Sequence, residues 1–293
     1  MTSLMVAMTV SCGLILASIS LLQIARDNFQ HHHQAALLED SAAFALEIIA
    51  RTLQQAAQKG SSDSLDLLSE TSPFNLSDGS VQGLDNARMS SDTTGIGTAS
   101  VAALNGNDVM AVNLHSVDGD ALNCAGFVVP AGSSHSPESG WVMFHVVPGI
   151  DGEPDLHCRY RGQKKWDSQA ILSGVEYFQV LYGLDTDGDN LPNQYLSASA
   201  IAEKDKTKPA SDLSWWRRVA AVHVALVLRS PAGDRQSAVF NGLSLFGDDY
   251  VTANASTDPG TRIGPEDLVA AVRTRARRQV DAVIFLHRPA LVP

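Results

Sequence analysis

The first 25 residues of the chain are mostly apolar and carry no charged side chain, and Arg26 is the first charged residue. A helix of that length would be about 37 Å long, which exceeds the roughly 30 Å of a bilayer core. A secretory signal peptide fits this run less well, because such a signal has a basic start and a shorter apolar segment. The pattern therefore predicts a membrane-spanning helix.

The pattern then changes to apolar positions that recur every three or four residues, without Pro or Gly before Gly60. This period is typical of an amphipathic helix with one apolar stripe. The members of the stripe are Leu37, Leu38, Phe44, Ala45, Ile48, Ile49, Leu53 and Ala56. We expect one unbroken helix to about Lys59, on the order of 85 Å long, whose second half packs on a domain.

The rest of the chain alternates short apolar runs with polar, glycine-containing stretches. Residues 60–107 are dominated by small and polar side chains and are expected to form a loop-rich connection with a short strand near Val81. The strand candidates are Val109–Leu114, Phe127–Val129, Trp141–Val147, Leu156–Arg161, Val175–Tyr182, Val219–Arg229, Ser237–Phe246 and Val280–His287. This order predicts an α+β fold in which the helix packs on a mainly antiparallel sheet. The expected segments are a transmembrane helix (1–25), its amphipathic continuation (26–59), the connection (60–107) and a β-rich globular head (108–293).

Charge and motifs exclude several classes of function. The chain has 21 Lys and Arg against 32 Asp and Glu, a net charge of -11, which argues against binding to the phosphate backbone of nucleic acids. No glycine-rich phosphate loop, nucleophile elbow or metalloprotease helix is present. We therefore expect no catalytic site.

The three cysteines differ in their surroundings. Cys12 lies in the apolar helix, where a thiol behaves as a small apolar side chain. Cys124 and Cys158 each lie beside a strand candidate of the head. If the head is outside the cytoplasm, this pair is predicted to form a disulfide.

The segment DTDGDNLPN carries the clearest chemical pattern. Its oxygen-bearing positions match positions 1, 3, 5, 7 and 9 of a calcium loop, and Ca²⁺ prefers such hard ligands. These positions are Asp185, Asp187, Asp189, Leu191 through its carbonyl, and Asn193. Two departures are Asn190 at the usual glycine position and Leu196 where a bidentate Glu normally stands. A Ca²⁺ site and a solvated Asp/Gly/Asn turn both remain open.

A basic cluster near the C-terminus stands out against the acidic background. It consists of Arg273, Arg275, Arg277 and Arg278. Such a cluster could accept an acidic patch of a partner, although a solvated face is the commoner explanation.

Several segments together resemble a known family. LMVAMTVS, followed by a long uncharged helix and then FALEIIARTLQQAA, is similar to the N-terminus of type IV pilins and pseudopilins. The segments GVEYFQVLYGLDTDGDNLPNQYLSA, WWRRVAAVHVALVLRSP and RRQVDAVIFLHRP resemble PilW-type minor pilins. The resemblance covers both ends and the middle of the chain but not residues 60–120.

The N-terminal motif departs from the family at one position. Ser3 stands where the family carries a glutamate just before the apolar stretch, and that glutamate is thought to pair with the terminal amine of a neighbouring subunit. Because the family's leader is not seen before this stretch, we expect either an upstream start codon or a chain that begins within the mature helix. Small residues that could support close helix packing in lipid are Gly13, Ala17 and Ser18.

The resemblance implies a minor pilin in the initiation or tip complex of a type IV pilus, supporting pilus biogenesis, twitching motility and adhesion. Its implied partners are other minor pilins, the major pilin and a tip adhesin, and its implied location is the inner membrane with a periplasmic head before assembly into the pilus. Two alternatives are a minor pseudopilin of a type II secretion system and a membrane-tethered sensor that binds calcium or another ligand.

Overall fold

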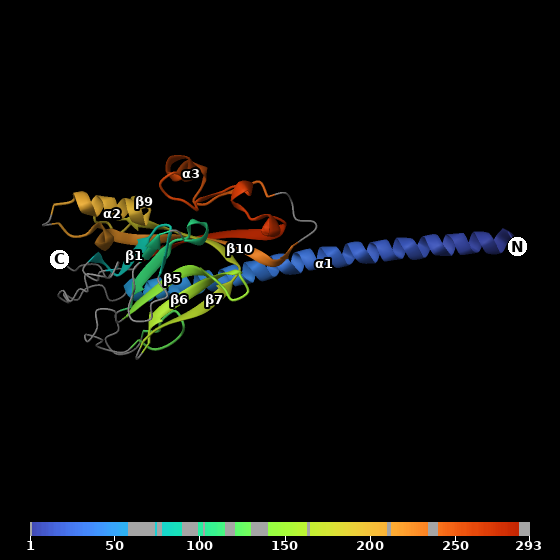
Figure 1. The fold of residues 1–293 in the computed structure, drawn as a ribbon, viewed down its shortest axis with the longest axis horizontal. Helices are drawn as coiled ribbons and strands as arrows, with labels where there is room; N and C mark the ends of the chain where they lie inside the picture. The colour runs from blue at the N-terminus through green and yellow to red at the C-terminus, as the bar shows by residue number, and fades with distance from the viewer. Residues whose placement is uncertain are drawn as a thin grey trace.

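The computed structural model shows a long helix that projects from a β-rich head (Figure 1). It describes residues 2–57, 74, 78–89, 99–101, 103–114, 121–129, 140–162, 165–209, 212–233 and 240–286. The helix α1 spans Thr2–Ala57 without a break. The predicted end near Lys59 lies outside the described residues.

The second half of α1 supplies one wall of the hydrophobic core. Its buried apolar positions are Leu38, Ala42, Ala45, Ile49, Leu53 and Ala56. Two members of the predicted stripe do not belong to this wall, because Leu37 and Phe44 are each 51% exposed. The predicted spacing of apolar positions along the helix was therefore right, but the buried face of α1 is rotated toward Ala42. The small side chain of Ala42 allows the sheets to approach the helix closely.

Two antiparallel sheets pack against this stripe. The first has the order β1-β4-β5-β6-β7, with β1 at Val81–Leu84, β4 at Val109–Asn113, β5 at Trp141–Pro148, β6 at Pro154–Arg161 and β7 at Trp166–Ser173. The second has the order β13-β10-β8-β9, with β8 at Val175–Leu184, β9 at Gln194–Leu196, β10 at Val219–Gly233 and β13 at Arg275–Phe285. The expected α+β architecture is thus confirmed.

Smaller elements cover the sheets. They are the strand pair β2 (Ala87–Met89) and β3 (Ala99–Val101), the strand pair β11 (Leu243–Ser244) and β12 (Arg262–Ile263), the helices α2 (Ala198–Thr207) and α3 (Asp248–Asn254), and the short 3-10 helices η2 (Leu104–Gly106), η3 (Trp215–Arg218), η4 (Pro265–Asp267) and η5 (Ala270–Val272). The segment expected to be loop-rich, residues 60–107, contains β1, β2 and β3 among its described parts.

The strand predictions succeeded where apolar runs are long and failed where they are short. Phe127–Val129 carries a single bridge, from Leu122 to Val128. Among the described residues of Ser237–Phe246, β11 is the strand present. The last strand begins earlier than predicted, at Arg275, and His287 lies outside the described residues. The prediction missed β7, in which half of the side chains are polar and half are exposed because it is the edge strand of its sheet.

A buried histidine lies in the middle of the first sheet. His145 of β5 is 4% exposed and pairs across the sheet with His157, their ring centroids 6.1 Å apart. Neither ring nitrogen of His145 has a hydrogen-bond partner among the described residues. Burial, aided by His157 and Arg159, lowers the pKa of His145 to about 3. The folded protein therefore holds this imidazole neutral.

The lowered pKa of His145 predicts that the folded protein becomes less stable as the pH falls. The unfolded chain takes up a proton on His145 near pH 6.5, whereas the folded chain does so only near pH 3. The contribution of His145 is therefore present above pH 6.5 and is lost as the pH falls, by up to about 1.4 kcal/mol per pH unit. We expect His145→Leu to unfold with a shallower pH dependence between pH 6.5 and 4, measured by chemical unfolding of the full chain in detergent. His33→Gln, at an exposed position of α1, is the control, and equal slopes for the wild type and His145→Leu would contradict the prediction.

Candidate assembly helix, acidic loop and ionic network

The first half of α1 exposes apolar side chains on every side. Those that are 47% exposed or more are Met5, Val6, Met8, Val10, Leu14, Ile15, Leu16, Ile19, Leu21, Leu22, Ile24 and Phe29. Among the described residues, α1 is the one helix long and apolar enough to cross a membrane, and its most apolar window is not buried by the head. So large an apolar surface requires lipid or other protein to cover it.

Four hydroxyl groups of this half are satisfied within the helix. Thr9, Ser11, Ser18 and Ser20 each donate to a backbone carbonyl three or four residues earlier, at 2.8–2.9 Å. Because these donors have partners in their own helix, they do not require water or a neighbouring chain. The surface is therefore compatible with a bilayer.

The small residues singled out for close packing all lie on the exposed surface. Gly13 and Ala17 are one helical turn apart and therefore share a face, with Ser18 beside them. A Cβ atom added at Gly13 would meet no atom within 4 Å. Ser3, at the family's glutamate position, is also exposed. The structure thus leaves all four positions accessible to a neighbouring helix.

A disulfide joins Cys124 to Cys158 of β6, with the Cα atoms 6.0 Å apart. This is the pair that the sequence favoured. The side chain of Gln55 on α1 accepts a hydrogen bond from the backbone N–H of Leu122 at 2.9 Å, which holds the same segment against the helix. Beside the disulfide, a groove of about 340 Å³ is lined by Phe44 and Ile48 of α1 and by Ile171 of β7, among others.

The acidic loop connects β8 to β9. Carboxylate oxygens of Asp185, Asp187 and Asp189 lie within 4.8 Å of one another, so the structure brings together the three acidic positions of the predicted calcium loop. The Asn193 amide nitrogen donates to Asp187 at 3.2 Å, while its oxygen accepts from Thr186. Leu191 joins the loop through its backbone N–H, which donates to Asp189 at 2.8 Å.

Backbone N–H groups hold the first carboxylate in place. Asp185 accepts from Gly188 at 2.6 Å and from Asn190 at 2.9 Å. Burial raises the pKa of Asp185, but these N–H groups outweigh it and leave the pKa below its usual value. Asn190 takes the left-handed conformation, with φ of 66°, so it makes the turn that glycine usually makes at this position of a calcium loop. The loop thus orders its own carboxylates by hydrogen bonds and could hold a weakly bound cation.

Comparison with known proteins finds a family match for the head. Residues 143–287, just under half of the chain, match the family model described as type IV pilus-assembly protein W. This match supports a PilW-type pilus protein. No curated protein and no solved structure shows significant similarity to it.

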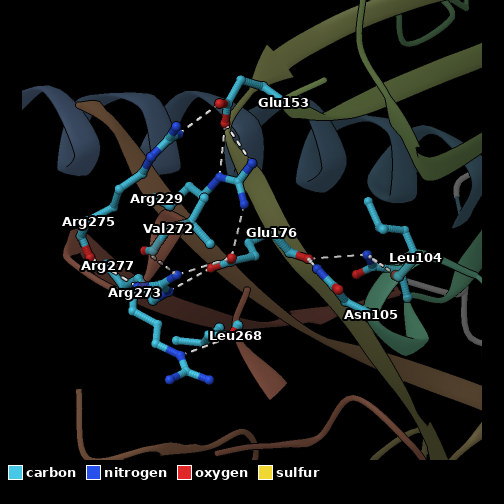
Figure 2. A network of polar contacts seen from close by, with 11 residues as sticks. Leu104, Asn105, Glu153, Glu176, Arg229, Leu268, Val272, Arg273, Arg275 and Arg277 are labelled. Atoms are coloured by element: carbon cyan, nitrogen blue, oxygen red, sulfur yellow. Dashed lines mark hydrogen bonds and ion pairs between the residues drawn. The ribbon is translucent and has the colours of Figure 1, made fainter. Parts of the chain in front are cut away.

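An ionic network lies wholly within the part that matches the PilW model (Figure 2). Glu176 of β8 is 2% exposed and accepts hydrogen bonds from Arg277 of β13 at 2.6 Å and from Arg229 of β10 at 3.1 Å. Arg229 also binds Glu153 at 2.7 Å, and Arg275 binds the other oxygen of Glu153 at 2.7 Å. Since Glu153 precedes β6 in the first sheet, the network joins the two sheets of the head.

The network corrects the interpretation of the basic cluster. Arg275 and Arg277 are neither a solvated face nor free for a partner, because their guanidinium groups bind Glu153 and Glu176 inside the molecule. Arg273 donates to the Leu268 carbonyl at 3.0 Å, and Arg278 forms an exposed pair with Glu39 of α1 at 3.0 Å. The two glutamates come from distant segments, so no local sequence signal could have identified them as partners.

The buried part of the network predicts a large effect of neutralising one carboxylate. Glu176→Gln leaves the guanidinium of Arg277, 3% exposed, without its counter-charge. We expect the free energy of unfolding of the full chain to fall by about 3–5 kcal/mol, measured by denaturant unfolding in detergent. Glu39→Gln breaks an exposed ion pair in the same protein and should change it by less than about 1 kcal/mol. Equal effects of the two substitutions would show that the buried network does not stabilise the head.

Proposed function

We propose that this PilW-type chain is a minor pilin that takes part in initiation or tip assembly of a type IV pilus, and so supports pilus biogenesis, twitching motility and adhesion. The role is structural and not enzymatic. Before assembly α1 anchors the chain in the inner membrane with the head in the periplasm, and afterwards the chain is part of the pilus at the cell surface. Its partners are other minor pilins, the major pilin and a tip adhesin.

The observation that carries the proposal is the two-part surface of α1. One half is apolar all round and lies outside the head, whereas the other half buries a stripe in the head core. The helix is continuous between the halves, so the head is rigidly attached to the apolar segment. A plain anchor does not require that continuity, whereas packing of helices between subunits does.

Ser3 supports a position at the tip. An ion pair between a glutamate and a terminal amine gains strength in a low-dielectric membrane, and a serine cannot form it. A subunit in the repetitive body of a filament would lose this contact, whereas a subunit that begins the filament would lose less.

The first test is a clean deletion strain, scored for surface pili and twitching beside secretion of exoproteins. We expect pili and twitching to be lost and secretion to remain normal. Lost secretion with normal pili would instead place the chain in a type II secretion system. If both remained normal while no second copy of the gene is present, the tethered sensor would replace the pilin proposal.

Complementation of the same strain tests the helix surface. The double variant Leu37→Ser, Phe44→Ser removes two exposed apolar side chains from the second half of α1, the half that packs on the head. It leaves the buried stripe of that half unchanged. We expect a several-fold loss of the chain from sheared filaments at unchanged total protein, because neighbouring subunits would no longer bury these side chains. Leu213→Ser, at a side chain 67% exposed on the head, is the matched control and should be incorporated normally. Normal incorporation of the double variant would exclude this face from assembly.

We also propose that Asp185, Asp187, Asp189, the Leu191 carbonyl and Asn193 bind Ca²⁺ weakly, with a Kd on the order of 10⁻⁴–10⁻³ M because no bidentate carboxylate occupies position 12. The proximity of the three carboxylates supports this site. We expect calorimetry on the full chain in detergent to detect a weak Ca²⁺ site that Asp187→Asn with Asp189→Asn abolishes. A wild-type titration with no such weak component would leave the segment as a solvated turn.

A further inference from the structure

Three aspartates from distant segments converge at a second place in the head. Asp85 lies in the turn between β1 and β2, Asp108 just before β4, and Asp258 after α3. One carboxylate oxygen of each lies within 4.8 Å of one from each of the other two. Their wide separation in sequence explains why no motif revealed them.

Backbone contacts fix two of the three carboxylates. Asp108 accepts from the N–H of Asn86 at 3.2 Å and from that of Val180 at 2.9 Å. Asp85 accepts from Ala198 at 2.9 Å and from Ser199 at 2.8 Å, the first residues of α2. These contacts position the acidic groups between β8, the β1–β2 turn and the start of α2.

Two glycines bring the third carboxylate to the other two. Gly106 and Gly260 both have left-handed φ values, 72° and 93°. A Cβ atom at Gly106 would lie 2.9 Å from the Pro259 carbonyl oxygen, and one at Gly260 would lie 3.0 Å from that of Asn105. The segments that carry Asp108 and Asp258 therefore pack backbone against backbone, an approach that side chains would prevent.

Two of the three carboxylates are buried, and the cluster lacks a counter-charge. Asp108 and Asp258 are each 2% exposed. Asp258 Oδ2 accepts from the Tyr250 hydroxyl at 2.8 Å, but its buried Oδ1 has no hydrogen-bond partner. Within the described part of the chain, no Lys or Arg forms an ion pair with any of the three. Carboxylates this close, two of them buried, repel one another, so their negative charges are costly where they stand.

We propose that Asp85, Asp108 and Asp258 bind one divalent cation, and that the cation is Ca²⁺. The oxygens are close enough to share one ion, since two ligands on opposite sides of Ca²⁺ are about 4.6–5.2 Å apart. Asp258 Oδ1 supplies a ligand that has no other role. A largely buried, irregular set of protein oxygens suits Ca²⁺, whereas Mg²⁺ requires a nearly ideal octahedron and retains its waters. The bound ion holds the loop after α3 and the β1–β2 turn together.

The test uses the full chain in detergent, with the acidic loop already disabled by Asp187→Asn and Asp189→Asn. After removal of metal with a chelator, we expect equilibrium dialysis with radioactive Ca²⁺ to show about one ion per chain. Ca²⁺ at saturating concentration should raise the Tm by roughly 5 °C or more, and Mg²⁺ at the same concentration should raise it less. No bound Ca²⁺ in this background, or an equal response to Mg²⁺, would overturn the proposal.

Asp258→Asn, made in the same background, distinguishes two explanations of the cluster. Either the carboxylates bind a cation, or they share protons among themselves. It should abolish Ca²⁺ binding, and its metal-free Tm should exceed that of the parent because one of three repelling carboxylates is gone. If Asp258→Asn does not fold, Asp85→Asn at the partly exposed position serves the same purpose. Asp249→Asn, at an exposed position of α3, is the control and should leave binding unchanged. Full Ca²⁺ binding by both Asp258→Asn and Asp85→Asn would overturn the proposal.

Discussion

The packing of two sheets against one helical stripe is the contact on which the head depends. Ala42, Ala45 and Ile49 of α1 lie in the same core cluster as Val112 of the first sheet and Val224 of the second. The two alanines allow the strands to approach the helix axis, and Ile49 fills the space between. Without α1, the inner faces of both sheets would be open to water, so the helix is part of the head's core and not an appendage to it.

The elements that could be predicted from the sequence are those whose pattern of apolar and charged residues lies within one segment of the chain. The charge-free start, the later three- to four-residue period and the long apolar runs of β8 and β10 each indicate one element without reference to the others. The face of a helix that is buried is decided by the head, so Leu37 and Phe44 were assigned to the wrong side. The edge strand β7 escaped prediction because half of its side chains are polar, and its pairing with β6 cannot be read from its own sequence.

The same distinction applies to the sites. The acidic loop and the cysteine pair could be found from sequence, because spacing or number alone identifies them. In β13 the alternation of a strand places Arg275 and Arg277 on one face, but only the fold reveals Glu153 and Glu176 as their partners. The buried aspartates are further from any sequence signal, since their proximity depends on two loops that meet through glycines.

Among the described residues, the polar contacts between helix and head are few compared with those inside the head. Arg278 and Glu39 form an ion pair exposed on both sides, which contributes at most about 1 kcal/mol, whereas the Glu176 network is buried and joins the two sheets. The head is therefore a stiff body within the region that matches the PilW model, and the attachment of α1 to it rests mainly on the apolar stripe. Such an attachment tolerates a change of surroundings from lipid to protein, because no charged contact must break when the exposed half of α1 exchanges one apolar environment for another.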